Sequence, residues 1–175
     1  MAFFKEDLMK VKAFIFDVDG VLSTECITID SDGELLRTAN TKDGYAIQYA
    51  VKKGYPVAII TGGTSAAVEQ RYRGLGVQDI YMSSKDKIAD FENFLSKYNL
   101  AADNIMYMGD DLPDYEVMQR VGVPTCPKNA VTQIKEISAY ISDMDGGCAC
   151  VRDVMEQVLR AHGNWYVADT KIQSI

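Results

Sequence analysis

Two groups of aspartates follow apolar runs of the chain. Asp17 and Asp19 come directly after the run Val11–Phe16, and a second acidic cluster occupies Gly109–Asp114 after another apolar run. Carboxylates beside a buried strand cost free energy unless water or a cation compensates them. If both runs are parallel strands, the two clusters share one edge of the sheet. Asp17, Asp19 and Asp110 would then form an oxygen-only site, which suits Mg²⁺.

Two further groups lie between these clusters in the chain. Thr61 and Gly62 follow a third apolar strand, and Lys87 stands at the start of a predicted helix. Taken singly, Thr61 could cap a helix and Lys87 could be a solvated lysine. The order Asp-x-Asp, Thr-Gly, Lys and Gly-Asp-Asp-x-x-Asp, each at a strand end, instead indicates one combined site. The spacing does not continue as a calcium-binding EF-hand loop.

Short apolar runs alternate with helical patterns along the whole chain. Continuous apolar runs favour strands that are buried on both faces of a parallel sheet. The expected strands are Val11–Phe16, Pro56–Ile60, Ile80–Met82, Ile105–Met108, Val121–Pro124 and Tyr140–Ile141. The expected helices are Asp43–Lys53, Ser65–Leu75, Asp86–Tyr98, Pro113–Arg120 and Val151–Ala161. This alternation predicts an α/β fold with a doubly wound, mostly parallel sheet, which binds ligands beyond the carboxyl ends of its strands.

One segment interrupts the alternation. Alternating apolar residues on both sides of the turn Ser31–Gly33 predict a projecting β-hairpin over about residues 24–40. The intervals from Asp17 to Thr61 and from Thr61 to Lys87 are too short for a separate cap domain. We therefore expect a single domain over residues 1–175, with a C-terminal tail over about 163–175.

Net charge, the length of apolar runs and the cysteine pattern limit which partners the protein could bind and where in the cell it would be found. The 175 residues carry a net charge of −7, which disfavours binding to nucleic acid or to an anionic membrane surface. No apolar run is long enough to span a bilayer, and the first twelve residues lack a signal-peptide pattern. Four cysteines without a CxxC pair are typical of reduced thiols. We expect a cytoplasmic protein.

The four motifs together resemble those of the haloacid dehalogenase superfamily, over about residues 11–161. The resemblance implies a Mg²⁺-dependent phosphatase with a HAD-like Rossmannoid fold, in which Asp17 is the nucleophile and Asp19 the general acid and base. It also implies that Thr61, Gly62 and Lys87 bind the phosphoryl group. The metal ligands would be Asp17, the Asp19 backbone carbonyl and Asp110. Asp111 and Asp114 would orient metal-bound waters and Lys87.

Three further features resemble one capless family, the 3-deoxy-D-manno-octulosonate 8-phosphate (KDO 8-phosphate) phosphatases. They are Thr41–Tyr45 (TKDGY), Gly146-Gly147 followed by Val151–Val154, and the ending Ile172–Ile175. The resemblance implies a role in lipopolysaccharide sugar biosynthesis, a homotetramer whose tail reaches a neighbouring active site, and substrate contact by Lys42. Family members often have Arg at the positions of Lys42 and Gly63.

Alternative interpretations remain at this point. A related family acts on a nine-carbon 2-keto-3-deoxy sugar acid 9-phosphate, and a phospho-aspartate receiver domain shares the clustered aspartates, a Thr and a Lys. A non-catalytic binding protein is a third possibility, disfavoured because every catalytic position is filled. His162 is expected to be a cation at a helix C-terminus. Trp165 and Tyr166 could anchor the tail on a partner or pack locally.

Overall fold

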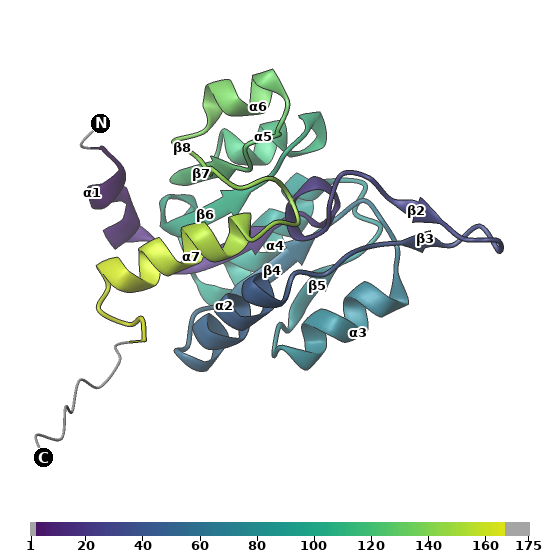
Figure 1. Ribbon diagram of the computed structural model, residues 1–175. Coiled ribbons are helices and arrows are strands. Elements are labelled where there is room, and N and C mark those ends of the chain that lie inside the picture. Colours follow the sequence, from purple (N-terminus) through teal and green to yellow (C-terminus); the bar gives the residue numbers. More distant parts are fainter. Residues whose placement is uncertain (1–2, 167–175) are drawn as a thin grey trace, which may run out of the picture.

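A six-stranded sheet forms the centre of the computed structural model, which describes residues 3–166 (Figure 1). The strand order is β5-β4-β1-β6-β7-β8, and every neighbouring pair is parallel. The strands are β1 (Ala13–Phe16), β4 (Val57–Ile60), β5 (Asp79–Tyr81), β6 (Ile105–Met108), β7 (Val123–Cys126) and β8 (Tyr140–Ile141). The parallel α/β architecture expected from the sequence is confirmed.

Helices cover both faces of this sheet (Figure 1). One face carries α1 (Phe3–Lys10), α2 (Thr41–Lys52), α3 (Ala66–Gly74) and α7 (Cys150–Ala161). The other carries α4 (Lys87–Tyr98), α5 (Tyr115–Met118) and α6 (Thr132–Ile137). Successive residues of β1 enter opposite cores, since Phe14 and Phe16 face the first helix layer and Ala13 and Ile15 the second. Burial on both faces explains why the strand reads as an unbroken apolar run.

The sheet reverses its direction of winding between β1 and β6. The chain passes from β1 to β4 and β5 on one side, then returns to β6 on the other side of β1. Phe16 is in register with Met108, and the Asp17 N–H donates to the Met108 carbonyl at 3.1 Å. Such a switch point opens a crevice at the carboxyl ends of the strands. The two acidic clusters therefore leave the sheet side by side.

The hairpin projects from the same end of the sheet (Figure 1). Its strands β2 (Thr28–Ile29) and β3 (Leu35–Leu36) pair antiparallel. Oδ1 of Asp30 accepts hydrogen bonds from the Asp32 and Glu34 amides, both at 2.9 Å, which closes the turn. Ile29, Leu35 and Leu36 are 68%, 43% and 52% exposed. The projecting hairpin predicted from the sequence is therefore present, and these three apolar side chains on it are exposed to solvent.

Within the sheet, the predicted strand Val121–Pro124 is displaced by two residues, since β7 spans Val123–Cys126; the larger differences from the sequence prediction lie outside the sheet. Helices α1 and α6 were not expected, and the predicted helix Pro113–Arg120 is a 3-10 turn, Leu112–Asp114, followed by the single turn α5. His162 lies at the C-terminal end of α7, as expected, and its ring also contacts the Tyr55 hydroxyl at 2.6 Å and the Leu8 carbonyl at 2.9 Å.

The described part of the tail ends at Tyr166. Trp165 packs locally, 5.0 Å between ring centroids from Tyr49, whereas Tyr166 is exposed. The predicted tail contacts of Ile172–Ile175 lie outside the described residues. Within residues 3–166, no helix has the length and apolar character needed to cross a bilayer.

Candidate active site

Asp17 and Lys87 meet at the carboxyl edge of the sheet. Asp17 is the first residue after β1, and Lys87 is the first residue of α4. The Lys87 ammonium donates to Oδ2 of Asp17 at 2.7 Å, and the Val18 amide donates to Oδ1 at 2.6 Å. Burial raises the pKa of Asp17 to about 7, and the nearby Asp114 charge adds to this shift, whereas Lys87 and the Val18 amide oppose it.

A second carboxylate completes the support of Lys87. Its ammonium also donates to Oδ1 of Asp114 at 2.7 Å. Burial alone would favour neutral Lys87, but the two carboxylates outweigh it and raise the lysine's pKa above the usual value. The hydroxyl of Tyr107, fully buried in β6, donates to the same Oδ1 at 2.6 Å. Sequence reasoning missed Tyr107, whose only signal was a hydroxyl within an otherwise apolar strand.

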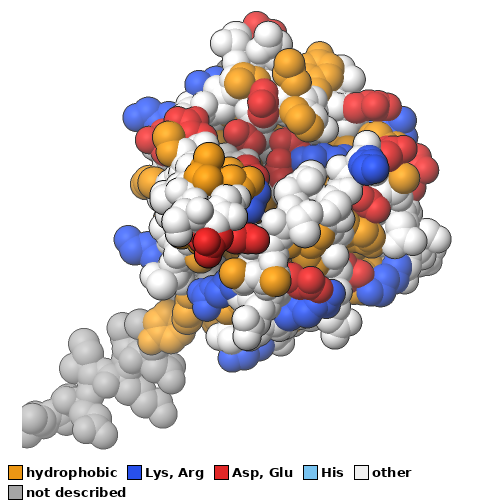
Figure 2. All heavy atoms as spheres, turned by 90° about the vertical axis from the view of Figure 1, so that its right-hand side faces the viewer, with side chains coloured by type: hydrophobic (Ala, Val, Ile, Leu, Met, Phe, Trp, Pro, Cys, Tyr) orange, Lys and Arg blue, Asp and Glu red, His pale blue; other side chains and the backbone are white. Residues whose placement is uncertain are grey.

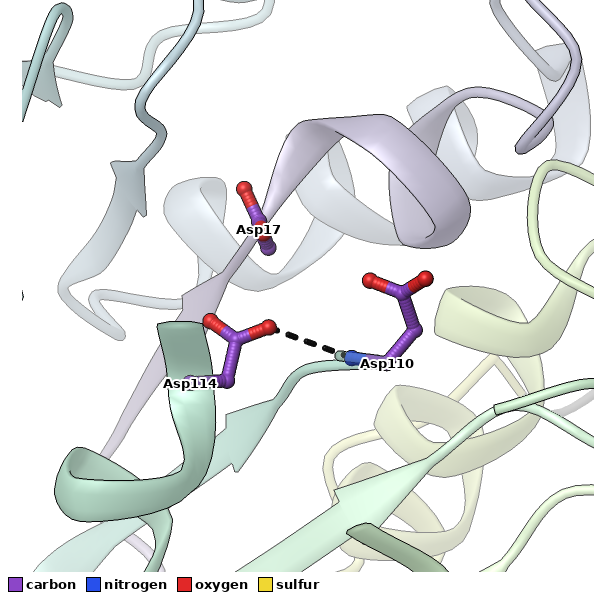
Figure 3. A group of neighbouring side chains, drawn as sticks. All are labelled: Asp17, Asp110 and Asp114. Atoms are coloured by element: carbon purple, nitrogen blue, oxygen red, sulfur yellow. Dashed lines mark hydrogen bonds between the residues drawn. The ribbon is translucent and has the colours of Figure 1, made fainter. Parts of the chain in front are cut away.

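Three carboxylates form a cluster that fits a cation (Figure 3). One carboxylate oxygen from each of Asp17, Asp110 and Asp114 lies within 4.8 Å of the other two. The Asp110 amide also donates to Oδ2 of Asp114 at 3.2 Å. Burial, together with the charges of Asp114 and Asp17, raises the pKa of Asp110 to about 7. Crowded, partly dehydrated carboxylates with mutual repulsion are suited to hold a divalent cation, and oxygen donors match Mg²⁺.

The loop after Asp17 is shaped to admit Asp110. Gly20 adopts φ of 78°, a conformation that side-chain-bearing residues rarely take. A Cβ at this position would overlap the Asp110 carboxylate. Glycine therefore lets the two acidic clusters approach each other.

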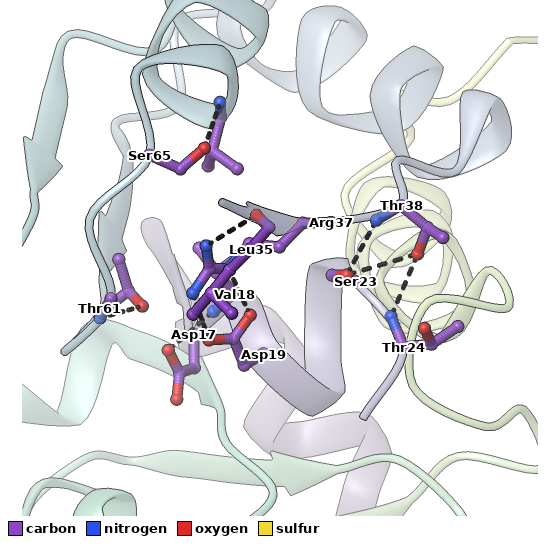
Figure 4. Close-up of polar contacts among 12 residues, drawn as sticks. Asp17, Val18, Asp19, Ser23, Thr24, Leu35, Arg37, Thr38, Thr61 and Ser65 are labelled. Atoms are coloured by element: carbon purple, nitrogen blue, oxygen red, sulfur yellow. Dashed lines mark hydrogen bonds and ion pairs between the residues drawn. The ribbon is translucent and has the colours of Figure 1, made fainter. Parts of the chain in front are cut away.

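Asp19 is not one of the three clustered carboxylates, and its side chain contacts Arg37 instead (Figure 4). Its carboxylate is one-third exposed and pairs with the guanidinium of Arg37 at the base of the hairpin, with an Nε–Oδ1 distance of 2.6 Å. Sequence reasoning did not single out Arg37. Its sequence context, the returning strand of a hairpin, resembles that of any solvated charge, and only the folding back of the hairpin brings it to Asp19.

Thr61 follows β4 and lines a pocket together with Asp17, Asp19 and Lys87. Its side chain is buried, and Oγ1 accepts from the Gly63 amide at 3.2 Å. The Thr61 carbonyl accepts from the Ser84 amide at 2.9 Å, so the Thr-Gly loop is fixed to the segment before Lys87. A pocket of about 450 Å³ is lined by Asp17, Asp19, Thr61, Gly62, Gly63, Ser84, Lys85, Lys87 and Pro113. Acidic side chains gather in a hollow on this face, beside basic ones (Figure 2).

Two predicted site residues, Asp111 and Lys42, make contacts outside the three-carboxylate cluster, and their predicted roles stay predictions. Asp111 is exposed and accepts from the Leu112 amide at 2.8 Å, so its carboxylate caps its own turn; Lys87 is oriented by Asp114 instead. Lys42 lies in the first turn of α2 and lines a separate pocket of about 400 Å³ with Tyr45, Arg152 and Trp165. Within one chain, Lys42 does not line the pocket that contains Asp17, and its contact with substrate stays a prediction.

The Gly146-Gly147 motif is hydrogen-bonded to the loop that follows Asp17. The Gly147 amide donates to the Val21 carbonyl at 2.8 Å, and the Asn40 side chain donates to the Gly147 carbonyl at 3.1 Å. Helix α7 follows, and its N-terminus lacks a local side-chain cap. Asp43 of α2 supplies one instead, since Oδ1 accepts from the Arg152 amide at 2.6 Å.

Comparison with known proteins shows the family of this chain. A family model of haloacid dehalogenase-like hydrolases matches residues 76–147. The 3-deoxy-D-manno-octulosonate 8-phosphate phosphatase KdsC of Escherichia coli is 36% identical over 165 residues, which cover 94% of this chain and 87% of the relative.

Solved structures agree with the sequence comparison. The 3-deoxy-D-manno-octulosonate 8-phosphate phosphatase of Yersinia pestis superposes with a TM-score of 0.88 and 31% identity, covering 91% of this chain and 86% of that one. The enzyme of the same name from Moraxella catarrhalis, in complex with magnesium, phosphate and KDO, gives a TM-score of 0.87 and 32% identity, covering 91% and 92%. The chain belongs to the 3-deoxy-D-manno-octulosonate 8-phosphate phosphatase family of haloacid dehalogenase-like hydrolases.

Proposed function

We propose that the protein hydrolyses 3-deoxy-D-manno-octulosonate 8-phosphate, with Mg²⁺ as cofactor and a phosphorylated Asp17 as intermediate. The observation that carries this proposal is the arrangement of Asp17, Lys87 and Asp114 at the switch point of the sheet, beside a pocket of about 450 Å³. Relatives that carry this activity in their names match over 94% of the chain. The reaction would supply the free sugar acid for lipopolysaccharide synthesis.

Asp17 is suited to act as the nucleophile. Hydrogen bonds from Lys87 and the Val18 amide hold its carboxylate in one orientation at the pocket. One oxygen would attack phosphorus and form the aspartyl phosphate while the bond from phosphorus to the sugar oxygen breaks. A covalent intermediate divides one difficult displacement into two easier ones.

The groups around Asp17 are suited to bind the phosphoryl oxygens. The Thr61 hydroxyl and the Gly62 amide come from the loop after β4, which is hydrogen-bonded to the segment that leads into Lys87 at the start of α4. Donors fixed in advance stabilise the charge that develops on the transferred group without reorganisation. Tyr107 and Asp114 would keep Lys87 in place.

Asp17, Asp110 and the Asp19 backbone carbonyl would hold the cation, with Asp114 supporting the cluster. Bound there, Mg²⁺ would neutralise the repulsion between the carboxylates and the phosphate dianion. Asp19 would give a proton to the departing sugar oxygen. In the second half-reaction it would take a proton from the water that attacks the aspartyl phosphate.

The exposed hairpin supports an oligomer. Ile29, Leu35 and Leu36 would be covered if hairpins of several copies packed together, and a homotetramer is the arrangement we propose. The neighbouring subunits would then enclose a pocket that has no cap domain. The cytoplasmic location and the single-domain organisation stay predictions from the sequence.

The substrate is tested by comparing kcat/KM for four phosphate esters in the presence of Mg²⁺. They are the eight-carbon 8-phosphate, the nine-carbon 2-keto-3-deoxy sugar acid 9-phosphate, glucose 6-phosphate and a nucleoside monophosphate. We expect the eight-carbon ester to be preferred over the last two by at least about 100-fold, as polar recognition of a leaving group permits. A preference for the nine-carbon ester would reassign the substrate, and a preference for hexose or nucleotide esters would reject the assignment.

A further inference from the structure

Arg37 connects the base of the hairpin to Asp19 (Figure 4). Its Nε donates to Oδ1 of Asp19 at 2.6 Å and its Nη2 donates to Oδ2 at 3.0 Å. A paired contact of this kind fixes both the position and the plane of a carboxylate. The Arg37 side chain is only 4% exposed, although β3 immediately before it is exposed. The guanidinium is therefore built into the site.

Gly63 provides the space that the guanidinium occupies. A Cβ on Gly63 would lie 2.7 Å from Nη2 of Arg37 and 3.4 Å from Oδ2 of Asp19. The first distance is too short for two unbonded heavy atoms, so even alanine would push against Arg37. The Thr-Gly-Gly loop and the hairpin thus fit each other at the position of Asp19.

Arg37 also lies between two cavities. The catalytic pocket includes Asp17, Asp19 and Gly63 in its lining. A second cavity of about 450 Å³, between the hairpin and α3, is lined by Arg37 together with Val18, Leu35, Ser65 and Arg71 among others. Asp17 and Asp19 line the same pocket, so a leaving group attached to a phosphoryl group at Asp17 would lie in a pocket that the Asp19–Arg37 pair borders.

We propose that Arg37 is a positioning residue for leaving-group protonation, with Gly63 kept free of a side chain to admit it; this rests on the proposed phosphatase function. When the bond between phosphorus and the sugar oxygen breaks, the O–H bond of the Asp19 carboxyl group breaks and a new O–H bond forms on the departing oxygen. Arg37 holds the Asp19 carboxyl group in the plane from which it delivers the proton, and both hydrogen bonds persist to the carboxylate that remains. Without Arg37, the Asp19 side chain turns freely and meets the sugar oxygen less often.

The test compares two leaving groups in Arg37→Ala and Arg37→Lys. The alkoxide of the sugar acid 8-phosphate requires a proton to depart, whereas 4-nitrophenolate departs without one. Single-turnover release of each leaving group isolates the first half-reaction. For Arg37→Ala we expect the rate for the sugar ester to fall about 100-fold and the rate for 4-nitrophenyl phosphate to fall less than about threefold, the scale of general acid catalysis. Arg37→Lys keeps a single donor nitrogen, so its single-turnover rate for the sugar ester should lie between the rates of Arg37→Ala and the wild type.

Combination with Asp19→Asn separates positioning from direct substrate binding. If Arg37 acts through Asp19, Arg37→Ala has little further effect in the Asp19→Asn background. Arg71→Ala is the matched control, because Arg71 lines the same second cavity and makes no hydrogen bond to Asp19 among the described residues; its effect should be equal in both backgrounds. Gly63→Ala, which displaces the guanidinium without removing it, should reproduce part of the Arg37→Ala defect.

Equal losses of Arg37→Ala on both esters would overturn the proposal, as would an undiminished loss in the Asp19→Asn background. Thermal unfolding of each variant identifies one that has failed to fold, in which case Arg37→Lys and Gly63→Ala decide the outcome. The proposed function fails separately: 4-nitrophenyl phosphate turnover that is absent, or that persists in Asp17→Asn, rejects the phosphatase mechanism whatever Arg37 does.

Discussion

Lys87 donates a hydrogen bond of 2.7 Å to Asp17, although seventy positions separate the two residues in the chain. One stands at the end of β1 and the other at the start of α4, so the contact depends on the order of strands β1, β4 and β5 between them. In this pair, Asp17 is the proposed nucleophile, and the ammonium group of Lys87 would bind the phosphoryl oxygens. The geometry of the pair leads directly to the first prediction.

Asp17→Asn should reduce turnover by at least about a thousandfold, because the amide lacks the attacking charge. The chain should remain folded, since Asp114 still accepts a hydrogen bond from Lys87. Steady-state rates and thermal unfolding in the absence of metal measure the two effects. Near-normal turnover would contradict the assignment of Asp17 as nucleophile.

Asp110→Ala should weaken the binding of Mg²⁺ and reduce activity together. Saturating Mg²⁺, at about 100 times its Kd, should stabilise the wild type by about 3 kcal/mol, and this increment should shrink in the variant. Thermal unfolding with and without Mg²⁺ measures it, with Asp103→Asn, a distant exposed carboxylate, as control. An unchanged Mg²⁺ increment in Asp110→Ala, or full wild-type activity in excess chelator, would argue against a metal site here.

Asp43→Asn should change how stability depends on pH. Burial raises the pKa of Asp43 to about 6, and its Oδ2 finds no hydrogen-bond partner among the described residues. Because the folded state binds this proton more tightly than the unfolded state, this group's contribution to stability is present at low pH. It is lost as pH rises from about 4 through about 6.

Replacing Asp43 by asparagine removes that titration and keeps an oxygen to accept from the Arg152 amide. The difference in unfolding free energy between variant and wild type should therefore shift in the variant's favour by up to about 3 kcal/mol between pH 4 and pH 7. Denaturant unfolding at both values measures it, and Asp32→Asn is the control for loss of a surface carboxylate. A pH-independent difference would show that Asp43 does not carry the shifted proton.

The double substitution Ile29→Ser and Leu36→Ser should dissociate the proposed oligomer. Both side chains are more than half exposed on the hairpin, so replacing them costs the fold of one chain little. Light scattering after size exclusion measures the mass, and Met9→Ser, which alters an exposed apolar residue on α1, is the control. A wild type that is monomeric at working concentration would refute the hairpin interface.

The sheet could be predicted closely because its signals are local. β1, β4 and β6 are apolar on both faces, so each reads as a continuous run ending at a polar motif. Helix α6 escaped prediction because it spans six residues and its N-cap, Val131, offers no side-chain hydrogen bond. The same limit applies to α1, a short helix before the first strand.

The acidic cluster could also be predicted, since parallel strands end at a common edge. The partners of those acids could not, because they depend on three-dimensional packing. Tyr107 is an interior strand residue whose hydroxyl happens to face Asp114, and Arg37 reaches Asp19 only after the hairpin folds back. Lys42 could be singled out from the sequence, but its position could not: it lines a pocket other than the one that contains Asp17.

The hairpin is inserted between β1 and α2, and it interrupts no strand of the central sheet. Residues that would contact the phosphoryl group come from the sheet edge, while Arg37 and part of the second cavity come from the insertion. The two parts can therefore diverge separately over evolutionary time. We expect a lineage that acquires a new substrate to accumulate its changes between β2 and the start of α2 while its reaction chemistry stays constant.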